Sequence, residues 1–467
     1  MNIPNSGVRF DRSERVLVIG LGRSGRASVA VLQPRVAQVY VTDEGPPSAL
    51  GPALAELEAA GVPFVAPDAL GETLPKVTVA VLSPGIPLNG ELVRRIQAAG
   101  VPVFSEVEVA YRICKAPIVA LTGTKGKSTT TALIGALFRQ AGYTTYVGGN
   151  IGNALIAETA VAKPEDWVIA EVSSFQLESI RSFKPRVSCI INVTPDHLDR
   201  YHSMDEYAEA KFRIFANQGP GDTFVGNLDD PIVAAAPGEE NTRIRARALW
   251  FAREPHRQTT LYLREGTAIV YAPPTGDPRP IEIMNVADIP LHGAHNVDNA
   301  MAAILVGLAA GLDRTAIAAG VRAFKPLHHR LETVVERDGV TYVDDSKATN
   351  PGAVIAALRS FDRPIVLIAG GKSKGTEFSE LGKVISSRAK AVVLIGESAQ
   401  AIAKHVKRAT VVHAASMDEA VVTATSFAQS GDIVLLSPGC ASFDMFASAE
   451  ARGEAFAAAA VGAQHVR

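Results

Sequence analysis

A short glycine-rich segment carries the clearest chemical signal in this sequence. The residues GTKGKST, at positions 123–129, follow the apolar run 118–121 and precede an apolar helix-like stretch. A phosphate group needs close backbone approach, N–H groups that converge at a helix start, a cation, and a hydroxyl that can ligate Mg²⁺. Gly126, Lys127 and Ser128 supply these, so the spacing predicts a nucleotide triphosphate site. The usual loop of this kind has a further glycine where Leu121 stands, which makes this a shortened variant; the alternative is an ordinary Gly/Thr-rich turn.

The first glycine-rich turn along the chain lies near the amino end. Gly20, Gly22 and Gly25 follow the apolar run 16–19, and Asp43 closes the next such run. Taken alone, this spacing is typical of a dinucleotide site, but a bound diphosphate would satisfy the same helix start as well as NAD would. Because a separate triphosphate loop lies downstream, we favour a nucleotide-diphosphate anchor over a redox cofactor.

A third candidate segment follows the apolar run 77–82. Its string SPGIP begins at Ser83 and has Gly85 at its centre. Because it follows a strand of the same predicted sheet, we expect it to line the same crevice as the first glycine-rich turn. The alternative is a rigid turn with no ligand.

Carboxylate, imidazole and amine groups follow the predicted strands of the middle segment. Glu171 ends a short apolar run, where an α/β sheet presents groups that face a ligand, and a carboxylate there can hold the Mg²⁺ of a nucleotide. Asp196 and His197 come after the next such run, and Lys211 lies on the helix-like stretch that follows. A lone histidine is more often structural and a lone helical lysine is usually solvated. Here both lie near the end of the Glu171 strand.

The elements that must position these residues alternate regularly. Short β-branched runs and alanine-rich helix-like stretches follow one another along almost the whole chain, which is typical of βαβ units around parallel sheets. The predicted class is α/β. At about 150 residues per domain, 467 residues have room for about three domains. We expect a Rossmann-like domain over 1–106, a central P-loop domain with a parallel sheet over 107–326, and a doubly wound Rossmann-like domain over 327–467. Short strands punctuated by Pro and Arg between about 228 and 290 predict a small antiparallel excursion.

The composition excludes several classes of protein. Hydrophobic residues make up 47% and charged residues 20%, which is ordinary globular usage and argues against long disorder. A formal net charge of -2 gives no electrostatic reason to expect nucleic acid or an anionic membrane as the main partner. We therefore expect small-molecule partners.

The cysteines and the amino end indicate in which cellular compartment the protein is expected. Cys114, Cys189 and Cys440 are too few and too scattered for a disulfide framework or a thiolate metal cluster, so we expect buried free thiols. The amino end is polar and lacks an apolar signal core, and no apolar run is long enough to cross a bilayer. These features predict a soluble cytoplasmic protein with no membrane partner.

The motifs occur in the order in which they are found in the Mur ligases. Besides GTKGKST, the chain has GGNIG, EVSSFQLE, NVTPDHLDRY and HGAHNVDNA, at 148–152, 171–178, 192–201 and 292–300. The sequence resembles that family over nearly its whole length. Within the family, DDSKATNP at 344–351 and LLSPGCASFDMF at 435–446 are similar to the branch that adds D-glutamate.

The resemblance implies a clamp of three domains. The first would hold the UDP end of UDP-N-acetylmuramoyl-L-alanine, the second ATP, and the third D-glutamate. ATP would phosphorylate the alanine carboxylate, and the amine of D-glutamate would attack the resulting acyl phosphate through a tetrahedral intermediate. Each stage develops negative charge on oxygen, which Mg²⁺, Lys127 and backbone donors can stabilise. The product would be a peptidoglycan precursor, and we expect the enzyme to act as a monomer.

The resemblance also implies two Mg²⁺ sites. Ser128 and Glu171 would ligate the first ion, while His197 and a carbamylated Lys211 would serve the second. A lysine with a pKa of ~10.4 is almost wholly protonated and captures CO₂ poorly. The surroundings of Lys211 must therefore favour its neutral amine, and a nearby metal charge could provide that bias. Lys127, His197 and Lys211 are the expected catalytic residues.

Matching positions assign the remaining contacts. ATP would be held by residues of the glycine-rich loop and of the later motifs: Gly123, Thr124, Lys125, Gly126, Lys127, Ser128, Thr129, Asn296, Asn299, His329, Arg330, Asp345 and Lys347. The UDP substrate would be held by residues of the first two domains: Gly22, Arg23, Ser24, Asp43, Ser83, Gly85, Asn150 and Ser173. D-glutamate would be held by residues of the third domain: Thr349, Lys374, Ser442 and Phe443. Lys374 would neutralise a substrate carboxylate.

Three alternatives remain. A related amide ligase could add another amino acid or act on a folate-like substrate, against which the string at 344–351 argues. An NAD(P)-dependent oxidoreductase built on the first glycine-rich turn would leave the 123–129 loop without a role. A nucleotide-binding regulator without catalytic activity is disfavoured because the expected catalytic and metal-binding residues are all present.

Overall fold

A computed structural model describes residues 8–198, 200–236, 243–274, 279–373, 375 and 377–462, without the side chains of 47–49. The chain divides into two compact units. The first comprises Met1–Ile289 and Asp298–Phe324, and the second comprises Pro290–Val297 and Lys325–Arg467. No helix in the described ranges is long and apolar enough to cross a membrane.

The first unit begins with a parallel sheet of four strands in the order β2-β1-β3-β4. The strands are β1 (Arg15–Ile19), β2 (Gln38–Thr42), β3 (Val79–Leu82) and β4 (Val103–Ser105). The helices between them are α1 (Arg23–Leu32), α2 (Pro47–Ala59), α3 (Leu70–Thr73) and α4 (Glu91–Ala98), with short 3-10 turns η1 (Pro67–Ala69) and η2 (Leu74–Lys76). Alternate residues of β1 enter different cores: Val16 and Val18 one, Leu17 and Ile19 the other. Both faces of the sheet are therefore covered, as parallel sheets require.

The central sheet has nine strands in the order β13-β12-β11-β10-β9-β8-β5-β7-β6. Its strands are β5 (Ile118–Thr122), β6 (Thr145–Gly149), β7 (Trp167–Glu171), β8 (Val187–Ile190), β9 (Thr223–Asn227), β10 (Arg247–Ala252), β11 (Thr259–Arg264), β12 (Ala268–Tyr271) and β13 (Ile281–Asn285). The expected parallel core is confirmed. The expected antiparallel excursion is confirmed for β11 to β13, which extend the same sheet, whereas β10 pairs parallel with both of its neighbours.

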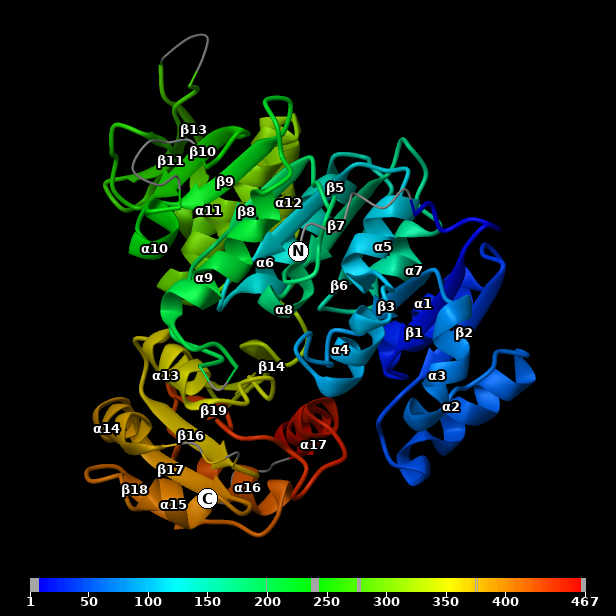
Figure 1. Ribbon diagram of the computed structural model, residues 1–467. Coiled ribbons are helices and arrows are strands. Elements are labelled where there is room, and N and C mark those ends of the chain that lie inside the picture. Colours follow the sequence, from blue (N-terminus) through cyan, green and yellow to red (C-terminus); the bar gives the residue numbers. More distant parts are fainter. Residues whose placement is uncertain are drawn as a thin grey trace. The chain divides into compact units, whose positions relative to one another are not determined.

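Helices line the central sheet (Figure 1). They are α5 (Glu106–Ile113), α6 (Lys127–Gln140), α7 (Leu155–Thr159), α8 (Ser174–Leu177), α9 (Met204–Phe212), α10 (Pro231–Ala234), α11 (Ala294–Ala309) and α12 (Arg314–Ala323), with 3-10 turns η3 (Arg213–Phe215) and η4 (Val286–Asp288). α6 contacts α12, and a Cβ on Gly320 would lie 2.8 Å from Cδ2 and 3.2 Å from Cα of Leu137, so the glycine favours the close approach of the two helices.

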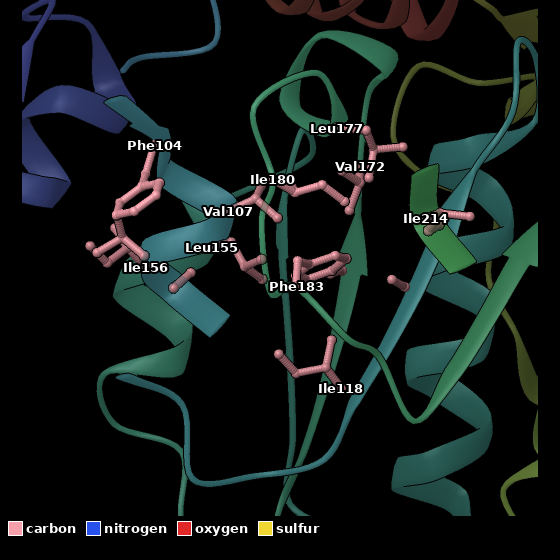
Figure 2. Close-up of a cluster of buried hydrophobic side chains, with 14 of the residues drawn as sticks. Phe104, Val107, Ile118, Leu155, Ile156, Val172, Leu177, Ile180, Phe183 and Ile214 are labelled. Atoms are coloured by element: carbon pink, nitrogen blue, oxygen red, sulfur yellow. The ribbon is translucent and has the colours of Figure 1, made fainter. Parts of the chain in front are cut away.

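One buried cluster joins the two sheets of the first unit (Figure 2). Phe104 of β4 and Val107 of α5 belong to it, together with Ile156 of α7 and Phe183. A fully buried side chain of this size contributes roughly 1.5–3 kcal/mol. This shared core explains why the four-stranded and nine-stranded sheets form one compact unit.

The second unit contains a six-stranded sheet in the order β14-β15-β19-β16-β17-β18, with only β14 antiparallel to its neighbour. Its strands are β14 (Glu332–Arg337), β15 (Val340–Asp344), β16 (Ile365–Gly370), β17 (Ala389–Ile395), β18 (Thr410–His413) and β19 (Ile433–Leu436). Its helices are α13 (Pro351–Arg359), α14 (Ser379–Arg388), α15 (Ala399–Ala403), α16 (Met417–Phe427) and α17 (Ala449–Gly462). In β16, Ile365 and Leu367 enter one core while Val366 and Ile368 enter the other. The sheet is covered on both faces, so the predicted doubly wound architecture is confirmed.

Candidate functional site

The 123–129 loop has the predicted strand-loop-helix geometry. β5 ends at Thr122 and α6 begins at Lys127, with Gly126 as its N-cap in the left-handed region at φ 81. A Cβ on Gly126 would lie 2.2 Å from Oδ1 of Asn299, so only glycine fits here. Ser128 lies in the first turn of α6, and the N–H groups at a helix start point toward the site where an anion binds.

Asn192 closes this loop from the side, and sequence reasoning did not single it out. Its Oδ1 accepts hydrogen bonds from the N–H groups of Thr124 at 3.0 Å and Lys125 at 2.9 Å, and its Nδ2 donates to the carbonyl of Lys125 at 3.0 Å. The hydroxyl of Thr124 lies 3.2 Å from the hydroxyl of buried Tyr207 and accepts from the N–H of Thr194 at 3.0 Å. The only sequence signal was that Asn192 opens the string NVTPDHLDRY directly after β8.

Two lysines donate to neighbouring carbonyls of the loop. Lys127 Nζ donates to the Thr124 carbonyl at 2.9 Å, and Lys211 Nζ donates to the Gly123 carbonyl at 2.8 Å. Lys211 is only 1% exposed, and its amine lies 4.4 Å from the ring centroid of Tyr207. Lys211, which the sequence analysis placed only near the end of the Glu171 strand, therefore contacts the loop directly.

The environment of Lys211 favours its neutral form. Burial and, to a smaller extent, the charge of Lys127 lower the pKa of its amine to about 6, against the opposing charge of Asp196. The sequence-based expectation assigned this bias to a metal charge. In the structure burial is the largest cause of the lowered pKa.

Glu171 presents an open carboxylate oxygen at the carboxyl end of β7. The residue is 1% exposed, and its Oε1 accepts from Nδ2 of Asn150 at 2.9 Å. Its Oε2 is buried without a hydrogen-bond partner in the part of the chain that the structure describes. A buried carboxylate oxygen left open in this way fits a metal ligand, since such groups otherwise find a donor. Asn150, predicted to contact the muramoyl substrate, donates this hydrogen bond and so orients Glu171.

His197 has an unusual backbone and an accessible ring. Its φ is 55, and 45% of its side chain is exposed. The ring meets Phe175 edge-on at 4.9 Å and Tyr207 at 6.1 Å, and Nε2 lies 3.9 Å from Oδ2 of Asp196. Because Tyr207 also contacts Lys211 and Thr124, the loop, the buried lysine and this histidine share one neighbourhood.

Several residues predicted to bind the UDP substrate lie in or beside the first glycine-rich turn. Asp43 accepts from the N–H of Leu21 at 2.6 Å and of Gly45 at 2.7 Å, and Ser83 Oγ donates to the carbonyl of Gly20 at 3.2 Å. A Cβ on Gly25 would lie 1.8 Å from the same carbonyl. Three of the predicted UDP-binding residues are exposed beside it, and one is half-buried: Gly22, Arg23, Gly85 and Ser24.

Ser173, also expected to contact the UDP substrate, caps a helix. Its Oγ accepts from the N–H of Gln176 at 3.3 Å, and the Gln176 side chain accepts from the N–H of Ser173 at 2.9 Å, which makes a capping box. This contact gives Ser173 a structural role in starting α8.

In the second unit, predicted nucleotide residues cluster around the end of β15. The ring Nδ1 of His329 lies 2.7 Å from Oδ2 of Asp344, and the His329 N–H donates to Glu332 at 2.8 Å. These three residues place possible metal-ligand atoms within 4.8 Å of one another, but their mutual hydrogen bonds already account for the arrangement. Asp345 is buried and accepts from Ser437 Oγ at 2.9 Å; burial raises the pKa of its carboxyl to about 7, against that hydrogen bond and the charge of Arg330.

The other predicted residues of the second unit are distributed as follows. Lys347 pairs with Glu450, and Asn296 donates to the His292 carbonyl at 2.7 Å. Three of the predicted ligand-binding residues are exposed and one is buried: Arg330, Thr349, Phe443 and Ser442. Lys374 lies outside the described residues.

Profiles of one family match three successive segments of the chain. They are the "Mur ligase MurD-like, N-terminal domain" over residues 14–105, the "Mur ligase middle domain" over 121–307, and the "Mur ligase, glutamate ligase domain" over 329–440.

Two curated relatives are similar over nearly their whole length. The UDP-N-acetylmuramoylalanine--D-glutamate ligase of Pelotomaculum thermopropionicum is 45% identical over 446 residues, which are 95% of this chain and 96% of the relative. The protein of the same name from Caldanaerobacter subterraneus subsp. tengcongensis is 42% identical over 450 residues, covering 95% of this chain and 97% of the relative.

Solved structures share the fold at lower identity. UDP-N-acetylmuramate-alanine ligase MurC from Thermotoga maritima has a TM-score of 0.58 and 19% identity, covering 95% of this chain and 98% of that one. MurF ligase from Thermotoga maritima in complex with ADP has a TM-score of 0.54 and 17% identity, and the match covers 84% of this chain and 90% of that one. With three domain profiles and relatives at 42–45% identity across 95% of its length, this chain belongs to the Mur ligase family.

Proposed function

We propose that this protein is an ATP-dependent ligase that joins D-glutamate to UDP-N-acetylmuramoyl-L-alanine, forming ADP, phosphate and a peptidoglycan precursor. The observation that carries the proposal is its similarity, over 95% of the chain, to relatives that bear the name of this activity. The geometry of the 123–129 loop supplies the chemistry that such a reaction needs.

The chain's own groups suit phosphoryl transfer to a carboxylate. The alanine carboxylate would attack the γ-phosphorus of ATP, and ADP would leave. Two positive groups serve this step: the amine of Lys127, which lies on the loop at the Thr124 carbonyl, and the N–H groups that start α6. The amine of D-glutamate would then attack the acyl carbon, and phosphate would leave as the attacking nitrogen loses its proton. Asn192 keeps the loop in register by bonding both sides of Lys125.

The residues present fit a divalent cation. Glu171 has a buried oxygen without a partner among the residues described, and the second expected ligand, Ser128, belongs to the 123–129 loop and lies in the first turn of α6. Bound Mg²⁺ would neutralise charge that develops on phosphate oxygens. A second Mg²⁺ served by His197 and Lys211 belongs to the same proposal.

A carbamate on Lys211 is also proposed. The amine is buried, hydrogen-bonded to the Gly123 carbonyl, and adjacent to the aromatic ring of Tyr207. Addition of the neutral amine to CO₂ forms an N–C bond and releases one proton, which converts a potential cation into an anion. An anion at this position would suit a second cation near the loop.

The remaining parts of the proposal concern the domains and the compartment. We propose domains at 1–106, 107–326 and 327–467, which hold UDP, ATP and D-glutamate in turn. Lys374, Thr349, Ser442 and Phe443 would position D-glutamate. The enzyme would act as a cytoplasmic monomer.

Phosphate release tests the function. The purified chain with ATP and Mg²⁺ should release phosphate only when both UDP-N-acetylmuramoyl-L-alanine and D-glutamate are present. Lys127→Ala should abolish release under every condition, which excludes a contaminating ATPase. Equal release with L-glutamate, lysine or diaminopimelate would overturn the substrate assignment.

A further inference from the structure

We propose that Arg452 of α17 is a positioning residue that fixes the loops expected to hold ATP and D-glutamate in the second unit. This inference rests on the function proposed above and deepens it. Arg452 is the largest fully buried side chain among the described residues and is 1% exposed. Sequence reasoning gave it no role.

The guanidinium of Arg452 bridges two loops at the carboxyl ends of neighbouring strands. Its Nε donates to Ser346 Oγ at 3.0 Å and one terminal nitrogen donates to the Ser346 carbonyl at 2.8 Å. The other terminal nitrogen donates to the Cys440 carbonyl at 3.1 Å. Ser346 follows β15 and Cys440 follows β19, and these strands pair in parallel. One side chain therefore ties together both strand ends.

The residues beside these contacts are the ones expected to hold ligands. Ser346 lies between Asp345 and Lys347, which are expected at the nucleotide, and Cys440 lies two residues before Ser442, which is expected at D-glutamate. A shift of either loop would move these groups, because their positions depend on the backbone that Arg452 holds.

A third segment joins the same cluster. The N–H of Lys372 donates to the Ala441 carbonyl at 2.8 Å, and the N–H of Ala441 donates to the Lys372 carbonyl at 3.1 Å. A Cβ on Gly371 would lie 3.3 Å from a terminal nitrogen of Arg452, so the arginine lies against the backbone that follows β16. The loops after β15, β16 and β19 thus share one buried support.

The first turns of α17 reinforce this support. Ser346 Oγ donates to the Ala449 carbonyl at 2.7 Å, and Glu450 pairs with Lys347. A Cβ on Gly453 would lie 2.1 Å from Nδ1 of His329, so the glycine leaves room for the His329–Asp344 pair. The start of α17 contacts the 344–350 segment at successive points.

Holding two loops explains a buried arginine at this position better than a gain in folding stability does. Burying a guanidinium is unfavourable unless its donors are satisfied, and an apolar side chain of similar size is often as stable or more so. A planar fork with several fixed donors can hold two loops at once, whereas a lysine amine donates from a single point. The contacts to both Ser346 and Cys440 use that fork.

The test compares Arg452→Lys and Arg452→Gln with the wild type. We expect the KM for D-glutamate to rise about tenfold or more and that for ATP severalfold, since loss of one hydrogen bond to a charged group corresponds to roughly that factor. The KM for UDP-N-acetylmuramoyl-L-alanine should stay within about twofold, because its expected site lies in the first unit. Thermal melting identifies any variant that fails to fold, and Arg452→Lys, which keeps the charge, is the more conservative of the two.

Arg363→Lys is the matched control. Arg363 donates to Thr341 Oγ1 at 3.0 Å, the Gly431 carbonyl at 2.6 Å and the Asp432 carbonyl at 3.1 Å. It therefore bridges β15 and β19 as Arg452 does, but at their amino ends. Its replacement should leave all three KM values within about twofold of the wild type.

Hydrogen exchange gives a readout that does not depend on activity. In Arg452→Lys, amides of the 344–350 and 440–446 segments should exchange about tenfold faster, while those of β16 and β17 stay unchanged; Arg363→Lys should not accelerate the two segments. If Arg452→Lys shows unchanged exchange and a KM for D-glutamate within twofold of the wild type, the inference is overturned. Equal rises of all three KM values in Arg452→Lys and Arg363→Lys would also overturn it. A wild type without D-glutamate-dependent phosphate release would refute the proposed function, and the exchange result would still decide whether Arg452 holds the loops.

Discussion

Lys127 and Lys211 donate to carbonyls of adjacent residues in one loop, yet their surroundings differ. Lys211 is 1% exposed and lies against Tyr207, whereas Lys127 starts α6 and is partly exposed. Burial without a paired anion favours a neutral amine, and only a neutral amine adds to CO₂. The start of a helix favours a bound phosphate, and Lys127, which lies there, suits the role of a cation beside it. At the scale of single residues, the difference in burial distinguishes Lys211, the proposed carbamate, from Lys127, the proposed phosphate contact.

Replacing Lys211 tests the carbamate. Lys211→Ala should lower kcat by at least about 100-fold, because the anion expected to serve the second Mg²⁺ is lost, and with it the cation that would neutralise charge on the phosphate oxygens. Full activity of Lys211→Ala would refute the carbamate role.

Asn192 offers a second test at this scale. Asn192→Ala removes the bridge to Thr124 and Lys125, so the loop loses its fixed geometry and the KM for ATP should rise about tenfold. Asn217→Ala is the control, since the Asn217 side chain also bonds the backbone of a distant segment: its Nδ2 donates to the carbonyls of Arg181 and Phe183, both at 3.0 Å. Steady-state kinetics that show equal KM values in the two variants would contradict a specific role for Asn192.

Two glutamates at the start of α5 have carboxyl pKa values that are shifted in opposite directions. Glu106 accepts from the Ile156 N–H at 2.6 Å, while its Oε2 has no partner within the described ranges, and burial raises its pKa to about 7 against the Ile156 hydrogen bond and the Arg23 charge. Burial would also raise the pKa of Glu108, but hydrogen bonds from Ser182, the Arg181 N–H and Arg112 together lower it. Glu108 therefore anchors the segment that leads into the buried Phe183.

The stability of Glu106 and Glu108 variants should respond to pH with opposite signs. The unfolded Glu106 ionises near pH 4.5 and the folded one near pH 7, so its ionisation costs stability progressively across that window. Glu106→Gln should therefore gain roughly 1–3 kcal/mol relative to the wild type between pH 5.5 and 8. Glu108 is stabilised as an anion, and that contribution is present above its unfolded pKa and lost as pH falls through its lowered folded pKa. Glu108→Gln should therefore lose at least ~2 kcal/mol at pH 7 and less at pH 4.

Thermal melting of both variants across this pH range provides the measurement. The two residues lie on the same helix and differ mainly in their hydrogen-bond partners, so each controls for the other. Shifts of the same sign in both variants would contradict the assigned environments.

At the scale of the whole molecule, the sequence predicted the α/β class, the doubly wound last sheet and the order of the motifs. These features depend on local patterns: apolar runs of strand length, helix-like stretches, and glycines where a loop must approach a helix start. The structure confirms the parallel core of the central sheet and the antiparallel β11 to β13. The chain divides into two compact units because β4 and α5 share a core with the central sheet, which no local pattern reveals.

The supporting residues could not be predicted because their partners are distant in sequence. Asn192 bonds residues 67 and 68 positions away, Lys211 bonds one 88 positions away, and Arg452 bonds Ser346 across 106 positions. Propensity and periodicity describe neighbours along the chain, so they predict which residue types could bind phosphate or metal. The residues that hold those groups in place become visible only when strand ends are brought together.

Transfer of oxygen during turnover tests the central claim most directly, namely that the acceptor carboxylate is activated by phosphorylation. UDP-N-acetylmuramoyl-L-alanine labelled with ¹⁸O in its alanine carboxylate would be turned over with ATP and D-glutamate, and the released phosphate analysed by mass spectrometry. The account predicts one ¹⁸O atom in each phosphate formed from doubly labelled carboxylate. Phosphate free of the label during full turnover would contradict it.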